Sequence, residues 1–404
     1  MNFLFAWRYF KSKKSTNAIN IIAWISVTAI AVGTASLIIV LSVFNGFEDL
    51  VKGLYADFYT DIRIGAVKGK IIKLTDQQIS QLKKINGIYD LSLVAEEKAL
   101  LVNGEYQTIV FIKGVDSNYT HTNKIINHIV RGKFETGTAS TPKLVVGAGI
   151  ENAAGLEVEK PAYPVLLYLP NKKAGNFSSP DALNSYNAFP SGTFMVQQEF
   201  DNKYVFSNLG FLKYMLDMKE DEFTSVEIQS DPNHSASIKK EIEQLLGPDY
   251  LVQTRYEQNQ SLYTVMTIER WVIYGILCLI LIVAAFNMIG ALTMLVLEKQ
   301  KDIAVLKAMG MHENGIQQIF LSEGMLLAGV GGISGMILAT LICIVQLKYK
   351  LIKLAGGSFL IDYYPVQLHI SDYFLVTGTV LGIAVAAAWI PSRKASLQEF
   401  SLKS

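Results

Sequence analysis

The sequence predicts a membrane protein with four transmembrane helices and a large α+β extracytoplasmic domain inserted between helices 1 and 2. Three observations lead to this fold class. Half of the 404 residues are hydrophobic and only 18% are charged, whereas soluble proteins carry about 25% charged residues. Four long stretches are almost free of charge, which is typical of transmembrane helices. A polar, mixed segment, residues 48–270, separates the first stretch from the second and predicts the inserted domain.

The four apolar stretches are 20 to 34 residues long and contain a single charged side chain, Glu323. A helix that crosses a bilayer needs about 20 mostly apolar residues, so each stretch is long enough. A helix buried in a soluble core is the alternative for any one stretch, and it is a poor one for all four together. We assign the transmembrane helices to residues 19–47, 271–297, 316–347 and 373–391.

Basic residues indicate the orientation of the chain. Four of them, and no acidic residue, lie between Arg8 and Lys14, so the positive-inside rule places the N-terminus in the cytoplasm. The apolar run that follows is longer than the core of a signal peptide, which favours an uncleaved anchor. Four crossings then return the tail, residues 392–404, to the cytoplasm. The loop 348–372 lies outside, although its three lysines oppose this assignment.

The first 18 residues form a separate segment at the cytoplasmic side. Phe3, Trp7 and Phe10 recur at helical spacing and share one face of a helix. This pattern fits an interfacial helix with its aromatic face among the lipid headgroups. A set of snorkelling anchors is an equally compatible interpretation.

The extracytoplasmic domain, residues 48–270, shows signals for both helices and strands. Thr75 and Gln78 form a capping box that predicts a helix. Asn103-Gly104 between two apolar runs predicts a β-hairpin. Residues 172–190 are rich in Gly, Pro, Ser and Asn and predict a long loop. Loops of this length are often functional, and a disordered surface segment is the alternative.

The chain carries no enzyme motif. It lacks a phosphate-binding loop, an H-E-x-x-H zinc motif and a G-x-S-x-G nucleophile motif. Its five histidines are scattered and its two cysteines lie in apolar stretches. A net charge of +1 gives no reason to expect a nucleic acid partner. We therefore expect a non-catalytic chain without its own cofactor or metal, and with an external source of energy for any directional work.

The loop between the second and third spans, residues 298–315, contains a short helical pattern. The pattern has an acidic residue near its start and a basic residue near its end, which suits the helix dipole. A glycine follows the pattern and can act as its C-cap. Apolar knobs on such a helix suit docking into a groove of another protein, and a connector lying on the membrane is the equally compatible alternative. The candidate residues are Lys299, Lys301, Asp302, Ile303, Val305, Leu306, Lys307, Met309 and Gly310.

Small residues recur in the third and fourth spans. Gly331 and Gly335 form one G-x-x-x-G pattern, and Gly378 and Gly382 form another. Small residues let helix backbones approach closely in lipid, and the neighbouring helix can belong to this chain or to another. We interpret Glu323 as an anchor near the membrane interface, with a functional intramembrane carboxylate as the alternative.

Several segments carry a resemblance to one family. They are Ala6–Phe10, Val40–Glu48, Val283–Asn287, Glu298–Gly310 and Pro391–Ala395. Through them the chain resembles, over nearly its whole length, the permease subunits of lipoprotein-releasing ABC transporters, the LolC/LolE group of the MacB/FtsX-type permeases. The cytoplasmic loop is the most specific piece, because it matches the pattern K-x-x-x-I-x-x-L-[KR]-x-x-G. The second proline that usually follows Pro391 is absent.

The resemblance implies a multi-pass permease of the Gram-negative inner membrane that extracts lipoproteins and passes them to a periplasmic carrier. Two permease protomers, identical or paralogous, would pair within the membrane lipid. They would sit on two copies of a separate ATPase, which binds ATP and magnesium. The loop 298–315 would be the coupling helix, with Ile303 and Leu306 docked into the ATPase.

The resemblance also implies a cargo site and a carrier site. A cavity between the first and second spans would shield the lipoprotein, and the loop 172–190 would hook the carrier. The cavity residues would be Val40, Val43, Phe44, Phe47, Phe286 and Asn287. The hook residues would be Asn176, Phe177, Tyr186, Phe189 and Pro190, without the arginine-containing stretch expected near the end of such a hook.

Two other functions remain compatible with the sequence. One is another permease of the same superfamily, either a MacB-like exporter or an FtsX-like regulator of cell-wall hydrolases. Chain length and the region between the second span and Gly310 favour the lipoprotein-releasing group. The other is a membrane-anchored sensor without transport, which has no need of a cytoplasmic coupling helix.

Overall fold

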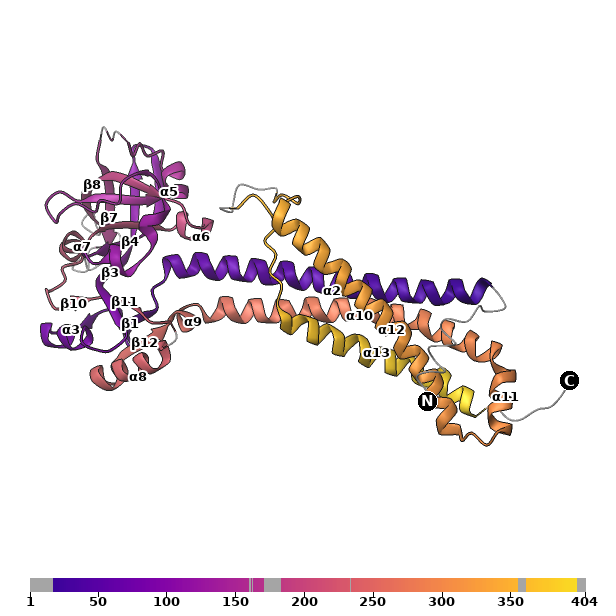
Figure 1. Ribbon diagram of the computed structural model, residues 1–404. Coiled ribbons are helices and arrows are strands. Elements are labelled where there is room, and N and C mark those ends of the chain that lie inside the picture. The colour runs from indigo at the N-terminus through magenta and orange to yellow at the C-terminus, as the bar shows by residue number, and fades with distance from the viewer. Residues whose placement is uncertain are drawn as a thin grey trace. The chain divides into compact units, whose positions relative to one another are not determined.

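The computed structural model describes residues 17–159, 161, 163–170, 183–232, 234–354 and 361–397. The chain divides into two compact units (Figure 1). Among the described residues, the helical unit comprises residues 17–50, 264–354 and 362–397, and the extracytoplasmic domain comprises those of residues 51–263 together with Ile361. The interfacial helix expected around Phe3, Trp7 and Phe10 lies outside the described residues.

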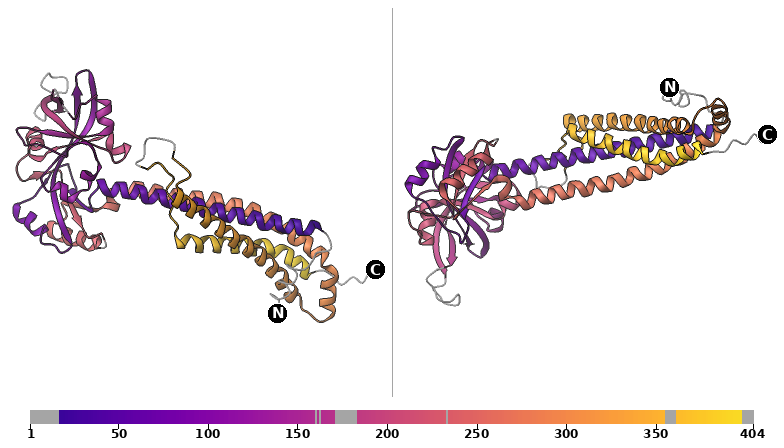
Figure 2. Two further views of the ribbon diagram at one scale, coloured as in Figure 1. Left: turned by 45° about the horizontal axis from the view of Figure 1, so that its top comes forward. Right: turned by 90° about the horizontal axis from the view of Figure 1, so that it is seen from below.

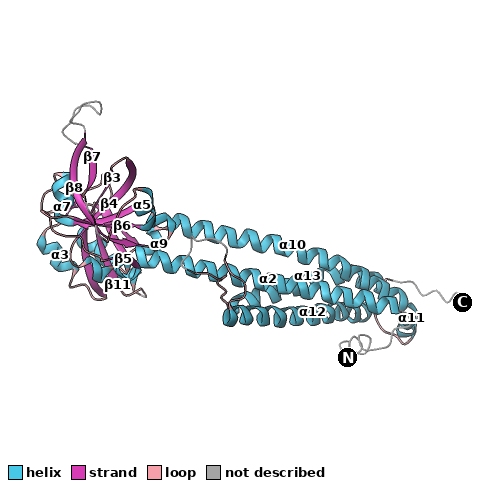
Figure 3. Cartoon of the chain, turned by 90° about the horizontal axis from the view of Figure 1, so that it is seen from above, coloured by secondary structure: helices cyan, strands magenta, loops and turns pink. Residues whose placement is uncertain are grey.

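Four helices are long and apolar enough to cross a membrane, which confirms the predicted fold class (Figure 3). They are α2 (Asn17–Phe58), α10 (Gln260–Glu298), α12 (Glu313–Tyr349) and α13 (Ile370–Ser396). The short helix α11 (Gln300–Ala308) joins α10 to α12. Helix α2 continues beyond the expected end of its span at residue 47, and α10 begins before residue 271. The absence of charge marks where a helix can enter lipid, whereas charged residues outside the bilayer can extend the same helix.

The first glycine pair packs within this chain. A Cβ atom at Gly331 would lie 2.8 Å from the carbonyl oxygen of Val27, and one at Gly335 would lie 2.9 Å from Cβ of Thr34. Both contacts are with α2, so α12 and α2 cross at a separation that only glycine permits. The second pair differs, because a Cβ atom added at Gly378 or Gly382 on α13 would have no neighbouring atom within 4 Å.

The extracytoplasmic domain is built on one large, mainly antiparallel sheet (Figure 2). Its order is β12-β1-β11-β3-β4-β9-β6-β8-β5, and β7 pairs with β3 and β8. The strands are β1 (Ile62–Ala66), β3 (Ile88–Asn103), β4 (Tyr106–Val115), β5 (Ile129–Gly132), β6 (Lys143–Gly147), β7 (Val165–Pro170), β8 (Leu183–Phe194), β9 (Tyr204–Asn208), β11 (Ser225–Ser230) and β12 (Tyr250–Thr254). A separate small sheet pairs β2 (Ile72–Lys73) with β10 (Glu222–Phe223).

Short helices pack on this sheet and complete two apolar cores. They are α3 (Asp76–Leu82), α4 (Tyr119–Thr122), α5 (Ala148–Ala153), α6 (Gln198–Asp201), α7 (Leu209–Leu216), α8 (Ser235–Leu246) and α9 (Arg255–Gln258), with a 3-10 turn at Ile125–His128. One core gathers side chains of α5, α7 and the central strands, and the other gathers side chains of α3, α8 and the strands around β1. The mixture of strands and helices agrees with the predicted α+β class.

Two local predictions are confirmed and one is wrong. Thr75 caps α3 with the reciprocal bonds to Gln78 of a capping box, and β3 pairs with β4 across the predicted hairpin turn. Residues 183–190, expected within a loop, instead form the first part of β8. The segment pairs with β7 as far as Ala188 and with β6 from Phe189 onward. Pairing with β7 along the whole of Leu183–Ala188 outweighs the weak strand propensity of the Asn and Ser residues there.

The C-terminal end of α2 is embedded in the extracytoplasmic domain. Phe58 is buried and stacks on Phe200 with ring centroids 4.0 Å apart. Nδ2 of Asn123 donates to the carbonyl oxygen of Phe58 at 2.6 Å. Three residues later, Asp61 accepts a hydrogen bond from Arg255 of α9 at 2.6 Å. The end of α2 and the segment that leads into α10 are therefore tied together inside one domain.

Asp201 of α6 predicts a pH dependence of the domain. Burial raises the pKa of Asp201 from 3.8 to about 6, although backbone N–H groups of Val196 and Gln197 donate to the carboxylate and oppose the shift. The folded domain therefore binds this proton more tightly than the unfolded chain, and its contribution to stability is lost as the pH rises through about 6. We expect the protection of amides around α6 against hydrogen exchange, relative to their intrinsic exchange rates, to be lower above this pH than below it, and to depend less on pH in Asp201→Asn. Identical pH profiles in the two proteins would contradict the assignment.

Candidate functional site

The loop between α10 and α12 contains a nine-residue helix, α11. Asp302 lies in its first turn, with its carboxylate 3.1 Å from Nζ of Lys299, and Lys307 lies in its last turn. The helix ends at Ala308, and Gly310 has a φ of +87°. A left-handed residue directly after a helix favours glycine, because other residues meet a steric penalty there. The charges of α11 thus complement its dipole, and the helix terminates abruptly at the glycine.

The apolar side chains of α11 divide into two sets. Ile303 is only 3% exposed and belongs to the core of the helical unit, together with Leu295 of α10 and Ile316 of α12. Val305 and Met309 are 57% and 79% exposed. Ile303 therefore fixes α11 to its own chain, and the exposed apolar surface of the helix is formed by Val305 and Met309.

This division corrects the expected docking pair. Ile303 is not available to a partner, and Leu306 is half-buried. Lys307 is directed to its own chain as well, because its Nζ donates to the carbonyl oxygen of Ser396 at 2.9 Å. Lys301 is exposed and lies on the same helix as Val305. The surface open to a partner is thus two apolar side chains with a neighbouring lysine.

An apolar groove of about 730 Å³ lies between α2 and α10. Its lining residues recur at helical spacing and are Ile21, Trp24, Ile25, Thr28, Ala29, Val32 and Gly33 of α2 and Ile280, Val283, Ala284 and Asn287 of α10. Trp24 and Val283 are 60% and 64% exposed. Asn287 supplies a polar group to a lining that is otherwise almost entirely apolar. A groove of this composition suits hydrocarbon or the apolar face of another helix.

The groove contains only part of the predicted cargo site. Asn287 lines it, and Phe286 is exposed on the adjacent face of α10. The other predicted cavity residues, Val40, Val43, Phe44 and Phe47, are half-buried and lie further along α2. The ring of Phe47 contacts that of Tyr364 edge-on, with centroids 5.7 Å apart. The structure therefore separates the N-terminal half of α2, which lines the groove, from the Val40–Phe47 segment.

The predicted hook is only partly described. Asn176 and Phe177 lie outside the described residues. Tyr186, Phe189 and Pro190 belong to strand β8, and Pro190 is buried. The Tyr186 ring packs edge-on against Phe211 and Tyr214 of α7. Among these three residues, Phe189 alone is exposed, at 44%.

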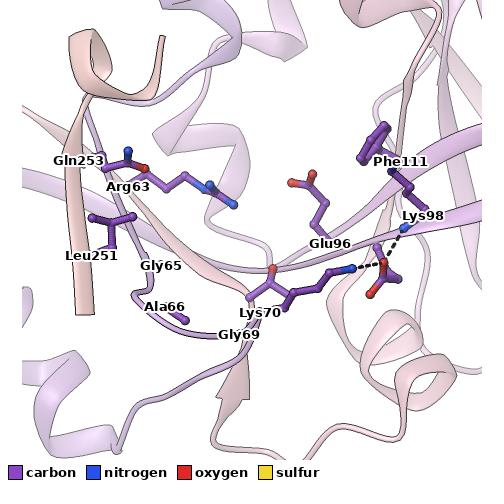
Figure 4. Close-up of a pocket in the computed structure, with 12 residues that line it drawn as sticks. Arg63, Gly65, Ala66, Gly69, Lys70, Glu96, Lys98, Phe111, Leu251 and Gln253 are labelled. Atoms are coloured by element: carbon purple, nitrogen blue, oxygen red, sulfur yellow. Dashed lines mark hydrogen bonds and ion pairs between the residues drawn. The ribbon is translucent and has the colours of Figure 1, made fainter. Parts of the chain in front are cut away.

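A charged pocket of about 430 Å³ in the extracytoplasmic domain was not anticipated from the sequence (Figure 4). Arg63 of β1 and Glu96 of β3 both extend into it, and Lys70 pairs with Glu97 at 2.8 Å on one side. The charged residues of the pocket come from segments that are distant in the sequence, so no local motif predicts the pocket. Within the described residues there is no group of three or more His, Cys, Asp or Glu side chains suited to a metal.

Glu323 lies inside the helical unit. Its side chain belongs to the buried face of α12 and is 1% exposed. The next residue, Gly324, approaches Ala388 of α13 so closely that an added Cβ would lie 2.6 Å from the alanine Cβ. The carboxylate therefore does not extend from an exposed face of α12, as an interfacial anchor would, because it lies where α12 packs on its neighbours.

Comparison with known proteins gives a consistent result over the whole chain. Residues 274–400 match the model of the FtsX-like permease C-terminal region, and residues 23–161 match that of the MacB-like periplasmic core domain. The LolC protein of Neisseria meningitidis serogroup B, named a lipoprotein-releasing system transmembrane protein, is 26% identical over 97% of this chain and 96% of its own length. The LolE protein of Haemophilus influenzae is 28% identical over 98% of this chain and 97% of its own. The crystal structure of the periplasmic region of MacB from Actinobacillus actinomycetemcomitans aligns with a TM-score of 0.35 and 11% identity, over 53% of this chain and 95% of that one.

Proposed function

This chain belongs to the LolC/LolE family of lipoprotein-releasing permeases, and we propose from this premise how its described surfaces serve that system. It is a non-catalytic permease subunit of a lipoprotein-releasing ABC transporter, in the membrane, with a periplasmic domain. The observation that carries this function is the alignment with LolC and LolE along almost the full length of both chains. Membership of the system implies an ATPase partner and a lipoprotein substrate.

The exposed side of α11 is the surface that we assign to the ATPase. Val305 and Met309 provide apolar knobs, and the buried Ile303 holds the helix in position. A short amphipathic helix of this kind suits a groove on a partner. The ATPase, in two copies, binds ATP and magnesium, and α11 transmits its movement to α10 and α12.

The groove between α2 and α10 is the surface that we assign to extraction of the lipoprotein from the bilayer. In our proposal a second permease protomer, identical or paralogous, faces it across the bilayer. The acyl chains of the lipoprotein are then shielded between the protomers, near Asn287 and the outer segment Val40–Phe47. Each buried methylene contributes about 0.8 kcal/mol, so an acylated protein does not leave lipid unless its chains remain covered.

We assign the contact with the periplasmic carrier to the segment 172–190. Its support is the position of this segment, which lies where the carrier-binding loop of LolC-like proteins would be although it lacks the arginine-containing stretch, together with the exposed ring of Phe189. Pro190 contributes to the packing of the strand instead of to a partner surface. A carrier contact would therefore involve Phe189 and the part of the segment that precedes β8.

Depletion of the protein in its own cells tests the function. We expect outer-membrane lipoproteins to accumulate in the inner membrane, because without the permease their acyl chains stay in the bilayer. Fractionation of the two membranes and immunodetection of a lipoprotein measures this, with re-expression of the intact chain as the control. Normal lipoprotein sorting combined with failure of drug efflux or of septal wall cleavage would instead identify a MacB-like or FtsX-like permease.

A further inference from the structure

A buried carboxylate joins three helices near the outer ends of their spans. Asp372, in the first turn of α13, is 3% exposed. Its Oδ2 atom accepts a hydrogen bond from Nδ2 of Asn45 on α2 at 2.6 Å, and its Oδ1 atom accepts one from Arg270 on α10, also at 2.6 Å. We call Asn45, Arg270 and Asp372 the outer clasp. A carboxylate so deeply buried is costly unless it is paired, so the clasp favours a defined spacing of the three helices.

The α2 side of the clasp is rigid. The backbone N–H of Gln367 donates to the carbonyl oxygen of Ser42 at 2.8 Å. A Cβ atom at Gly46 would lie 2.5 Å from the carbonyl carbon of Pro365. The segment before α13 therefore lies directly on the backbone of α2, and Asn45 itself is 1% exposed. Any movement that separates α2 from α13 would have to break backbone contacts.

The α10 side is held by side chains. Arg270 is 32% exposed, and one turn further along α10 the hydroxyl of Tyr274 hydrogen-bonds that of Thr379. Among the four spans, α10 is the least buried by the rest of the chain: 22% of its most apolar 18-residue stretch is buried, against 50% for α2. Helix α10 can therefore leave its neighbours at a smaller cost than α2, and the partly exposed Arg270 can reach water when it does.

We propose that Asp372 is a positioning residue for lipoprotein release, because it sets the separation of α2 and α10 at the outer end of the bundle through Asn45 and Arg270. This inference rests on the proposed function, in which cargo reaches the protein between these two helices. The clasp has two discrete arrangements, with Arg270 bound to Asp372 or released to water, while Asn45 keeps its bond in both. Two-state elements of this kind convert a small displacement into a defined opening.

An exchange of near-isosteric side chains tests the clasp without changing its volume. Asp372→Asn removes the charge that Arg270 binds, and Asn45→Asp places a second carboxylate against the first. The double variant Asn45→Asp with Asp372→Asn returns one carboxylate and one amide to the contact between α2 and α13, but Arg270 then faces the neutral amide of residue 372 and lacks its charged partner. The side chains occupy nearly the same volume in the wild type, the two single variants and the double variant. Differences among these proteins therefore report on the hydrogen bonds and ion pair of residue 372.

Two measurements are made on the full-length protein in its complex with the ATPase, in lipid nanodiscs. The first is the distance between spin labels at Asp49→Cys and Ile268→Cys, both exposed positions, in a background without Cys278 and Cys343. The second is ATP-dependent release of a triacylated lipoprotein. Each single variant should broaden and lengthen the distance distribution and lower release about tenfold, the effect of losing one buried charged hydrogen bond. The double variant should recover neither and should resemble Asp372→Asn, because Arg270 still lacks its carboxylate.

The outcomes separate the clasp from the function on which it rests. Unchanged distances and release in Asp372→Asn overturn the proposal. Full recovery of both in the double variant also overturns it, because the defect would then arise from the Asn45 contact and not from the loss of the Arg270 pair. If distances change in Asp372→Asn and stay changed in the double variant, while the wild-type protein releases no lipoprotein, the result supports the clasp and refutes the proposed function. A correctly folded state is verified in each variant by ATPase co-purification, since the clasp lies far along the helices from α11.

Discussion

Simultaneous replacement of Val305 and Met309 by aspartate should abolish productive docking of the ATPase while the permease still inserts into the membrane. The two side chains are 57% and 79% exposed and contact no core of this chain. A charge forced unpaired into an apolar interface costs about 3–5 kcal/mol, which corresponds to at least about a hundredfold loss of affinity. Co-purification of the ATPase with the detergent-solubilised variant measures docking, and lipoprotein release measures coupling.

Two further variants isolate the exposed face of α11. Asn314→Asp adds a negative charge near α11, at an exposed polar position in the first turn of α12, and should leave docking intact. Ile303→Asp should lower the amount of folded protein itself, because its side chain is 3% exposed in the core of the helical unit. Full ATPase binding and normal release in the Val305/Met309 double variant would show that α11 docks by another face.

Leucine at Gly335 should strongly destabilise the helical unit, whereas leucine at Gly382 should be tolerated. A Cβ atom at Gly335 meets the backbone of Ala31 and Cβ of Thr34 on α2, and one at Gly382 meets no atom within 4 Å. Overpacking of a well-packed contact costs about 1–3 kcal/mol, and more where the opposing atoms are backbone. The measurement is the midpoint of thermal unfolding in detergent, together with the yield of folded protein.

The two glycines form a matched pair. Both lie inside long apolar helices and both are the second glycine of a G-x-x-x-G pattern. The gain in helix propensity from glycine to leucine is about the same at each site, so it cancels in the comparison. Equal unfolding midpoints for the two variants would contradict the close crossing of α12 and α2. A greater loss at Gly382 would show that this pair contacts another helix in the assembled transporter.

The parts of the fold that the sequence predicts are those set by local physics. Missing charge predicts four spans because burying charge in lipid is costly, and the capping box at Thr75 predicts α3 because its hydrogen bonds are local. The extension of α2 to Phe58 was not predicted, because charged side chains do not end a helix in water. The strand at 183–190 was not predicted, because its pairing partners β6 and β7 lie elsewhere in the sequence.

The candidate site shows the same limit. The position of α11 and its glycine stop follow from a contiguous pattern, and the structure places both where that pattern puts them. The pattern does not tell which apolar residue of α11 faces inward. Ile303 and Val305 are similar side chains, and only the packing of α10 and α12 around the helix makes one buried and the other exposed. The outer clasp also escaped prediction, since Asn45, Arg270 and Asp372 are separated by 225 and 102 positions along the chain.

The uninterrupted length of α10 has a consequence for its angular phase. Its 39 residues contain no proline and no residue with positive φ, so the direction of Arg270 relative to Leu295 is set by the number of residues between them. One added residue would turn the clasp about 100° away from Asp372, while seven added residues would turn it only about 20° and lengthen the helix by about 10 Å. The rotation and the length of α10 can thus be changed separately. The relative direction of Leu295, near the coupling loop, and Arg270, in the clasp, is preserved only by insertions of about whole helical turns.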